Sequence, residues 1–592
     1  MSSIIWKLNA YAHVLYYYGK NMGVSEAGYR IKHKLFYSKR KKLVDYTAWR
    51  RSHIKDVTLE NVNEINRDGI SYFVRPSFGI VFADMDDNAD KKEIAAYPFV
   101  KSLRNGMLKD YRIVKLPKTA DKTELIKAVK SVKEDYLFFA RKDDFLHRSA
   151  IAALSNLVSG SPEAPDAIYT DEDSFEEVKG EQVFSEPYMK PDYASYYQES
   201  TNYIRRMTVV SKKLMLELLE SFADGEELPE CVSNGVDEMN PEFIFRVLER
   251  AKRVGHLDMP VYSARKGGNE PVTDAQIYIK YVREHFDRIG REGKVSLANE
   301  GTGRATVNIS YPVKGEPLVS VIIPNKDHAE DLKRAVNSVA AGSYKNLEFI
   351  IVENNSVLDE TEEAYKELLV RDDIDVKLLR YEKTGFNYSA INNMAIKEAR
   401  GEYILLLNND IEMVNPDAIR EMLGYAQRPD VGMVGARLYF EDKTIQHAGV
   451  VIGIGGLADH LLRGLDETDE IVKLYTGVSR EYSAVTAACA MISREIFDEI
   501  GGFDESIEVA FNDVDLCMKV TEKGKKIIYV AQAILNHYES KSRGQDDTLK
   551  KQKRFFAEVK KFSDRWHDRM MARDRYYNRN LTLVRTDASL KE

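Results

Sequence analysis

Cysteine is scarce in this chain of 592 residues: only Cys231, Cys489 and Cys517 occur, far apart in the sequence. Such spacing provides neither a disulfide framework nor the paired ligands of a zinc site, and it is typical of a reduced, intracellular protein. We expect Cys489 to be a small packing residue rather than a nucleophile.

Long hydrophobic runs and an excess of one charge are also missing. No stretch approaches the ~20 apolar residues of a membrane-spanning helix. Lys7 and Asn9 interrupt the first apolar stretch before the core of a signal peptide forms. The chain has 86 Lys and Arg against 94 Asp and Glu, a net charge of −8, which argues against a nucleic-acid partner. These absences predict a cytoplasmic protein, or one that lies on the inner face of the plasma membrane without crossing it.

The N-terminal segment, residues 1–55, is basic and aromatic. Residues 1–53 hold eleven Lys or Arg, against Glu26 and Asp45 as the acids. This composition suits peripheral contact with an anionic bilayer, where each Lys or Arg near the lipid contributes about 1 kcal/mol. The alternative is a pair of solvated helices packed on the next domain, and the sequence leaves both interpretations open.

From about residue 310, apolar strands alternate with amphipathic helices, which predicts an α/β sheet with parallel strands. Polar clusters follow three of these strands at the point where each ends. They are Asn325-Lys326, then Glu353-Asn354-Asn355-Ser356, and finally Asn408-Asn409-Asp410. Because ligands of open α/β sheets bind at the carboxyl ends of the strands, these clusters predict a binding site.

These strands and clusters resemble those of the bacterial family 2 glycosyltransferases, which have the GT-A fold. The match begins at Ser320–Pro324 and covers most of residues 318–580, with the motifs in the family's order and spacing. Gly501–Glu505 and Asn512–Leu516 are similar to the family's acceptor-side signature. Two further segments, Ile445–Gly449 and His537–Gly544, resemble the large two-domain members that build rhamnan, O-antigen and related surface polysaccharides.

The first half of the chain carries a degraded copy of the same pattern. The offset from Asp143 to Asp410 is 267 residues, that from Asn240 to Asp513 is 273, and that from Ser263 to His537 is 274. Near-constant offsets predict two tandem GT-A units with Rossmann-like, mainly parallel sheets and helical N- and C-terminal extensions. The expected domains are a basic aromatic helical segment at 1–65, a degenerate unit at 66–305, a catalytic unit at 306–545 and a helical tail at 546–592.

The tail has apolar residues at helical spacing, which predicts an amphipathic helix packed on the catalytic unit. They are Phe555, Phe556, Val559, Phe562 and Trp566.

Transfer of a sugar from a nucleotide requires neutralisation of the leaving diphosphate, a task suited to Mg²⁺ or Mn²⁺. Asn408-Asn409-Asp410 stands where the family has its Asp-x-Asp motif, so the resemblance makes Asp410 the main metal ligand and Asn408 a weaker one. It also places His537 in the metal shell. The alternative for Asn408 and Asp410 is that they only form a turn at the end of the strand, and the alternative for His537 is a structural role.

Transfer also requires a base that removes the proton of the acceptor hydroxyl. Asp513 aligns with the family's catalytic aspartate, and Asp515 is expected to point elsewhere, so that the two carboxylates do not act as a pair. The structural alternative for Asp513 is stabilisation of a helix N-terminus, worth about 0.3–1 kcal/mol, and the two roles are compatible. Residues 486–489 are expected to line the sugar pocket, and His447 to be structural.

The remaining candidates are expected to meet the nucleotide and its diphosphate. Glu353 can accept hydrogen bonds from a pyrimidine N–H or a ribose hydroxyl, although many relatives carry Asp in its place. The candidate nucleotide-sugar contacts are Pro324, Asn325, Lys326, Glu353, Asn387, Asn393, Asn409, Lys541 and Arg543.

The first half has lost the corresponding groups. Arg141 replaces the first metal ligand, Asn240 the base and Ser263 the histidine. We therefore expect a folded but degenerate unit that binds glycan or positions the active half. A bifunctional enzyme with two active units is the rival interpretation, and it requires a metal-free first site.

The resemblance implies an inverting, metal-dependent hexosyltransferase of polysaccharide biosynthesis. It would transfer a sugar from a UDP- or dTDP-sugar to a growing or undecaprenyl-linked surface polysaccharide, beside other enzymes of the pathway. Rhamnose is favoured by the resemblance alone, with glucose and galactose as alternatives. A different class, a non-catalytic glycan-binding scaffold, has no need of Asp410, Asp513 and His537 together.

Overall fold

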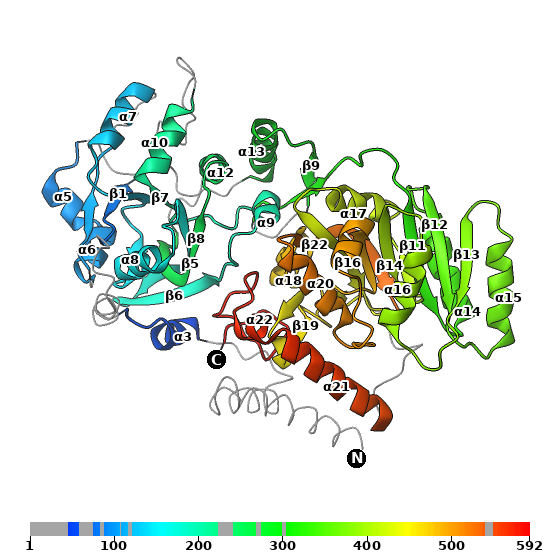
Figure 1. Cartoon of the computed structure of the whole chain (residues 1–592). Coiled ribbons are helices and arrows are strands. Elements are labelled where there is room, and N and C mark those ends of the chain that lie inside the picture. The colour runs from blue at the N-terminus through cyan, green and yellow to red at the C-terminus, as the bar shows by residue number, and fades with distance from the viewer. Residues whose placement is uncertain are drawn as a thin grey trace. The chain divides into compact units, whose positions relative to one another are not determined.

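The computed structural model describes residues 45–57, 75–82, 88–106, 108–116, 121–222, 241–267, 274–298, 304–538 and 549–591. These residues form two compact units, shown in Figure 1. The first unit lies within Lys42–Tyr193 and Asn202–Arg291, and the second within Ala194–Thr201 and Glu292–Lys591. No helix in these described ranges is long and apolar enough to cross a membrane. The domain boundaries expected at 65, 305 and 545 stay predictions, and most of the basic N-terminal segment lies outside the described residues.

The first unit is built on a mixed sheet with the strand order β2-β1-β3-β7-β5-β8-β4, and β6 pairs with β5. Its strands are β1 (Phe78–Phe82), β2 (Tyr111–Ile113), β3 (Tyr136–Ala140), β4 (Phe145–Leu146), β5 (Ala167–Val178), β6 (Glu181–Tyr188), β7 (Val209–Ser211) and β8 (Val254–Arg265). Its helices are α3 (Tyr46–His53), α5 (Lys91–Ala96), α6 (Pro98–Arg104), α7 (Lys122–Ser131), α8 (Ala150–Gly160), α10 (Lys212–Glu220), α12 (Pro241–Leu248) and α13 (Ala275–Arg288).

The second unit contains a larger mixed sheet in the order β13-β12-β11-β14-β21-β16-β22-β15, with β17 and β20 paired off this path. Its strands are β11 (Val319–Asn325), β12 (Leu347–Glu353), β13 (Asp375–Arg380), β14 (Tyr403–Leu407), β15 (Ile411–Met413), β16 (Val431–Tyr439), β17 (Ile445–His447), β20 (Arg480–Tyr482), β21 (Cys489–Ser493) and β22 (Lys526–His537). Two short sheets pair β9 (Lys294–Leu297) with β10 (Val307–Ser310), and β18 (Val450–Ile452) with β19 (Ala458–His460). The helices are α9 (Ser195–Ser200), α14 (Ala329–Ala340), α15 (Asp359–Leu369), α16 (Tyr388–Glu398), α17 (Ala418–Ala426), α18 (Glu470–Thr476), α19 (Arg494–Glu499), α20 (Asn512–Glu522), α21 (Leu549–Arg565) and α22 (His567–Met571), with the 3-10 turn Ile454–Gly456.

The two large sheets have the same topology. Reading from β2 in the first unit and from β12 in the second, successive strand pairs are parallel, parallel, antiparallel, antiparallel, parallel and antiparallel. The prediction of an α/β fold with two tandem units is thus confirmed. The sheets are mixed: three neighbouring strands are parallel at one side, and one more parallel pair, β5 with β8 or β16 with β22, lies toward the other side. The second unit adds β13 beyond β12.

Register makes the correspondence specific. Phe145 pairs with Ser263 in the first unit, as Ile411 pairs with His537 in the second. Ser263 therefore is the counterpart of His537. The turn before β4 has four residues, 141–144, whereas the turn before β15 has three, 408–410. Asp144, directly before β4, is accordingly the counterpart of Asp410, one residue later than the sequence offset placed it.

One hydrophobic cluster fixes three helices against the second sheet. It joins β-strand residues such as Ile322, Ile404 and Ile492 to α16, α20 and α21, which contribute Ile391, Val514 and Phe562 among others. The fully buried strands β11 and β14 supply this surface, because each is apolar on both faces. The predicted packing of the C-terminal helix on this unit is confirmed, and the helix that carries Asp513 lies between α21 and the sheet strands β16 and β22 in the same cluster.

Helix α9 is a short element of the second unit that comes from the middle of the first half of the chain. The Glu481 carboxylate lies at its N-terminus and accepts the backbone N–H groups of Tyr196 and Tyr197, each at 3.1 Å. The Arg480 guanidinium lies 3.8 Å from the centroid of the Tyr197 ring. The second unit therefore includes a helix whose residues precede their partner Glu481 by 285 and 284 positions.

Candidate active site at the carboxyl ends of β11, β12 and β14

The turn Asn408-Asn409-Asp410 and His537 meet because β15 pairs with the end of β22. The Nε2 atom of His537 lies 3.2 Å from Oδ1 of Asp410 and 3.4 Å from the amide nitrogen of Asn408. Both the aspartate and the histidine are buried. Asp410, Asn408 and His537, which the sequence analysis predicts to bind one metal ion, therefore lie together.

In the described part of the chain, two buried atoms of this cluster make no hydrogen bond of acceptable geometry: Oδ1 of Asp410, which lies 3.2 Å from Nε2 of His537, and Nδ1 of His537 on the other side of that ring. Leaving a buried polar atom unpaired costs about 1–3 kcal/mol, so an orphaned pair calls for an explanation. A divalent cation beside Oδ1 of Asp410 and Nε2 of His537 would explain the carboxylate oxygen, since carboxylate oxygen and imidazole nitrogen are its usual protein ligands. Rotating the Asn408 amide by half a turn presents its oxygen to the same point.

The protein alone offers such an ion a small ligand set. In the described part of the chain no group of three His, Cys, Asp or Glu is placed to hold a metal. Two such ligands and an amide fit a weakly held ion whose remaining ligands are phosphate oxygens and water, as is usual for Mg²⁺.

Asp513 stands in the first turn of α20, where its Oδ1 accepts the N–H of Val514 at 2.9 Å. Its other oxygen receives a long contact of 3.3 Å from the backbone N–H of Ala487. The next residue, Ala488, accepts the N–H of Asn408 at 3.0 Å. The loop 486–488 therefore links the candidate base to the candidate metal turn, and Asp513 keeps lone pairs for an incoming proton.

Asp515 faces away from this loop, as expected. Its Oδ1 accepts hydrogen bonds from Arg565 at 2.7 Å and from the Trp566 indole at 2.8 Å. It is a buried anchor of the C-terminal helix and not a partner of Asp513.

A pair of histidines lies on the other side of the 486–488 loop. His447 is fully buried, and its Nε2 lies 3.4 Å from the N–H of Thr486. Its Nδ1 lies 3.2 Å from Nδ1 of His460, which is partly exposed on β19. Burial, together with the nearby His460 and His537, holds the pKa of His447 well below its usual value, so this ring is neutral. The structural role expected for His447 stays a prediction; His460 carried no signal in the sequence beyond being a lone histidine.

The loops after β11 and β12 are joined by a network of hydrogen bonds. Asn325 donates to the Tyr365 hydroxyl at 2.8 Å, and that hydroxyl donates to Glu353 at 2.5 Å. Ser356 donates its N–H and hydroxyl to the same carboxylate. Asp327, in the left-handed region at φ 55°, accepts the N–H groups of two residues after Ser356. Strained residues of this kind cluster at ligand sites.

Asn409 connects this hydrogen-bond network to the turn Asn408-Asn409-Asp410, because its amide donates to Oδ1 of Asn325 at 2.7 Å. Pro324 is buried within β11, whereas Lys326 is exposed beside it. Four of the predicted nucleotide contacts, Pro324, Asn325, Glu353 and Asn409, are thus parts of one rigid loop pair at the sheet edge.

Asn387 and Asn393 hold a loop in the described structure. Asn387 caps α16 by accepting the N–H of Ala390 at 2.9 Å, and it donates to the carbonyl of Glu505. Asn393 both donates to and accepts from the backbone of Phe503, at 3.0 Å each. Their expected contact with the nucleotide stays a prediction. Lys541 and Arg543 lie outside the described residues.

The counterpart position in the first unit is filled by α3. The Arg50 guanidinium, 6% exposed, donates to Asp173 at 2.6 Å and to the hydroxyl of Ser263, the counterpart of His537, at 3.2 Å. Asp144 accepts from the Tyr262 hydroxyl at 2.5 Å. A fixed cation, bound to Asp173, and a hydrogen-bonded Asp144 therefore occupy the place that the candidate ion ligands hold in the second unit. Sequence reasoning had assigned this cation to Arg141, and Asn240 lies outside the described residues.

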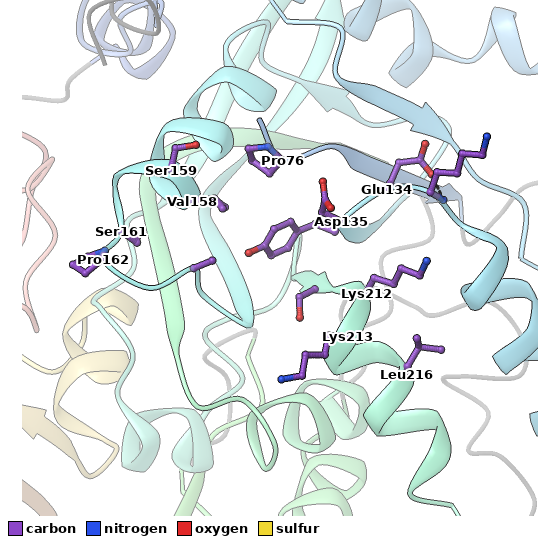
Figure 2. Close-up of a pocket in the computed structure, with 14 residues that line it drawn as sticks. Pro76, Glu134, Asp135, Val158, Ser159, Ser161, Pro162, Lys212, Lys213 and Leu216 are labelled. Carbon is purple, nitrogen blue, oxygen red and sulfur yellow. Dashed lines mark hydrogen bonds between the residues drawn. The ribbon is translucent and has the colours of Figure 1, made fainter. Parts of the chain in front are cut away.

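A cavity of about 690 Å³ lies in the first unit, at the opposite edge of its sheet. Figure 2 shows Pro76 before β1, Asp135 at the start of β3 and Lys212 at the start of α10 around it. The Lys212 ammonium is bound to the carbonyls of Lys130 and Val132. The cavity therefore belongs to the amino ends of the parallel strands and not to the candidate site.

Residues 320–501 match the family model described as "Glycosyl transferase family 2". The chain is 37% identical over 473 residues to "Uncharacterized protein y4gI" of Sinorhizobium fredii (strain NBRC 101917 / NGR234), covering 78% of this chain and 50% of that protein. It is 32% identical over 477 residues to "O-antigen biosynthesis protein RfbC" of Myxococcus xanthus, covering 77% of this chain and 34% of that protein. A shorter match, 26% identical, is to "Amylovoran biosynthesis glycosyltransferase AmsB" of Erwinia amylovora, covering 37% of this chain and 69% of that protein. The chain spans half or less of the length of the first two relatives.

Proposed function

Because residues 320–501 form a domain of the glycosyl transferase family 2, we propose that the second unit is an inverting glycosyltransferase. It transfers a sugar from a UDP- or dTDP-sugar to a hydroxyl of a growing or lipid-linked surface polysaccharide. The observation that carries the proposal is the buried contact of Asp410 with Nε2 of His537, in which Oδ1 of Asp410 has no hydrogen bond of acceptable geometry from any described residue.

Asp410, His537 and Asn408 would hold a divalent ion together with the diphosphate of the donor. When bound, Mg²⁺ or Mn²⁺ neutralises charge on the leaving nucleoside diphosphate. The loop pair built on Asn325 and Glu353 would seat the nucleotide, and Asn409 would keep it in register with the ion-binding turn.

Asp513 would act as the general base. The acceptor hydroxyl loses its proton to the Asp513 carboxylate as its oxygen forms the new bond to the anomeric carbon. The bond from that carbon to the diphosphate oxygen breaks on the opposite face, so the configuration inverts. A positioned base of this kind contributes about 10²- to 10⁴-fold to the rate.

We infer that the first unit does not catalyse transfer. The Arg50 guanidinium and the satisfied Asp144 carboxylate support this, because an ion would have to displace a buried cation that is already paired. The unit would instead bind glycan or position the second unit. A bifunctional enzyme is the alternative, and it predicts that substitutions around Asp144 impair transfer.

The names of the relatives support a role in surface-polysaccharide synthesis. Rhamnose is the sugar we propose from the resemblance of the sequence motifs alone, with other enzymes of the pathway as partners. The N-terminal segment would hold the protein at the inner face of the plasma membrane. A non-catalytic scaffold is the alternative function, and it predicts that no nucleotide sugar is consumed.

A thermal-shift screen tests the proposal directly. UDP-glucose, UDP-galactose and dTDP-rhamnose are added to the full chain with and without Mg²⁺ or Mn²⁺, and nucleoside diphosphate release is measured in parallel. A donor at about 100 times its Kd stabilises the folded state by about 2.7 kcal/mol. We expect a metal-dependent shift that Asp410→Ala removes. A shift of equal size in Asp410→Ala would contradict the ion site, and no release with any donor would favour the scaffold.

A further inference from the structure

The turn that leads into α20 is held by a carboxylate from the C-terminal helix. Glu558, on α21 and 2% exposed, accepts three backbone N–H groups. Its Oε1 receives those of Glu508 and Val509, each at 3.1 Å, and its Oε2 receives that of Ala510 at 3.0 Å. These residues stand directly before the helix that begins at Asn512.

Two further turns of α21 hold the next residues of the same segment. The Phe562 ring stacks on Phe511, with 5.2 Å between centroids. Arg565 and Trp566 hold Asp515. The contacts of α21 therefore bracket Asp513 from both sides, at residues 508–511 and at residue 515.

The segment before α20 needs these contacts, because its own residues do not stabilise its backbone conformation. Phe511, at the N-cap of α20, lies in the left-handed region at φ 63°, where a bulky residue is strained, and it makes no side-chain cap. Among the described residues, the hydrogen bonds to the Asp513 carboxylate come from backbone N–H groups, those of Val514 and Ala487. Its place is thus set by the path of the main chain.

The opposite side of the segment is tied to α16. Tyr388 donates its N–H to the carbonyl of Glu508 at 2.8 Å, and the Ser389 hydroxyl donates to the carbonyl of Ile507 at 2.6 Å. The carbonyls of the turn therefore bind α16 while its N–H groups bind Glu558. Removing the carboxylate frees one side and leaves the other in place.

We propose that Glu558 is a positioning residue for Asp513: it fixes the main chain of the turn at residues 508–510 and thereby the aim of the base. This inference rests on the proposed function of the second unit. A displacement of about 1 Å at a reacting group lowers a rate by about 10²-fold, so the expected effect of losing the clamp is on turnover rather than on donor binding.

Glu558→Gln tests the inference, since glutamine keeps the shape but offers one acceptor oxygen and turns an NH₂ group toward the backbone. We expect kcat for nucleoside diphosphate release from UDP-glucose, UDP-galactose or dTDP-rhamnose to fall at least tenfold, with the donor KM within twofold of the parent. The matched control is Val559→Ala, which removes buried packing from the neighbouring position, where the side chain has no polar atom to hold the N–H groups of the turn. It should lower the melting temperature by at least as much and leave kcat within twofold.

Two results would overturn the inference: an unchanged kcat in Glu558→Gln, or kcat losses in both variants that follow their losses of melting temperature. If Glu558→Gln does not fold, Glu558→Asp carries the same test, because the shorter carboxylate cannot span all three N–H groups. Asp513→Asn, assayed in the same experiment, separates a failure of the positioning role of Glu558 from a failure of the assignment of Asp513 as the base. If it abolishes release while Glu558→Gln does not change it, only the positioning role fails. If neither variant differs from an active parent, the assignment of Asp513 fails as well.

Discussion

A substitution of Glu481 tests most sharply whether helix α9 is part of the second unit. Its side chain is fully buried and accepts the N–H groups of Tyr196 and Tyr197 at the start of α9, with the Ser195 hydroxyl 3.3 Å away. Glutamine in its place has one acceptor oxygen and no charge, so an NH₂ group faces one of the two N–H donors. Glu481→Gln therefore perturbs α9 without changing the volume of the site.

The magnitude follows from the bonds that are lost. A hydrogen bond to a charged group contributes about 1.5–3 kcal/mol, and a partly buried carboxylate at a helix N-terminus contributes up to about 2 kcal/mol. We expect a combined loss of about 2–4 kcal/mol, since such contributions are not additive. At about 2–4 °C for each kcal/mol, the melting temperature of the second unit falls by roughly 4–16 °C.

Differential scanning calorimetry of the full chain measures this loss. Glu402→Gln is the control, because it makes the same change of charge at an exposed position of the same unit. A Glu481→Gln transition within about 2 °C of the control would refute the claim that α9 is built into the second unit.

Three further predictions concern the two sites. Arg50→Met leaves the buried Asp173 carboxylate without its cation, so the first unit should lose about 3–5 kcal/mol in urea unfolding; a loss below 1 kcal/mol would contradict the account. Burial opposes the charge of Glu172, but Lys190, Arg205 and Arg206 lower its pKa to about 2, below the usual glutamate value of about 4.5. A depressed carboxyl pKa stabilises the fold above the unfolded value, so the first unit should lose stability as the pH falls from about 4.5 to 2, and Glu172→Gln should flatten that part of the curve. Asn408→Asp adds a carboxylate beside Asp410 and His537 and should lower the metal concentration for half-maximal activity about tenfold; an unchanged requirement would exclude Asn408 as a ligand.

The fold class and the core of the candidate site could be predicted from the sequence because both depend on local pattern. Strands that end in polar clusters place those clusters at one sheet edge, and the contact of Asp410 with His537 follows once β15 and β22 pair. The resemblance to the family 2 glycosyltransferases, drawn from the same clusters, is confirmed by the match over residues 320–501.

The parts that sequence reasoning missed depend on contacts between distant residues. Nothing in the local sequence of α9 indicates that it belongs to the unit formed by Glu292–Lys591, and Arg50 precedes its partner Ser263 by 213 positions. Glu558 did leave a signal, because it is an acid three residues after Phe555 and four before Phe562, on the apolar face of the predicted helix. An acidic residue on a buried face requires a partner, and the spacing alone does not say which.

One length difference also escaped the sequence comparison of the two halves. The offset of 267 residues holds along β3 and β14, but the turn after β3 has one residue more. Asp144 rather than Asp143 therefore corresponds to Asp410, and strand register reveals it where residue counting does not.

The most direct test of the central claim compares Asp513→Asn with Asn240→Ala, its sequence counterpart in the first unit. Nucleoside diphosphate release and the donor-induced thermal shift are measured on both. The account predicts that Asp513→Asn lowers release about 10²- to 10⁴-fold while the thermal shift is preserved, and that Asn240→Ala changes neither. Full release by Asp513→Asn together with loss of release by Asn240→Ala would contradict it, since catalysis would then belong to the other unit.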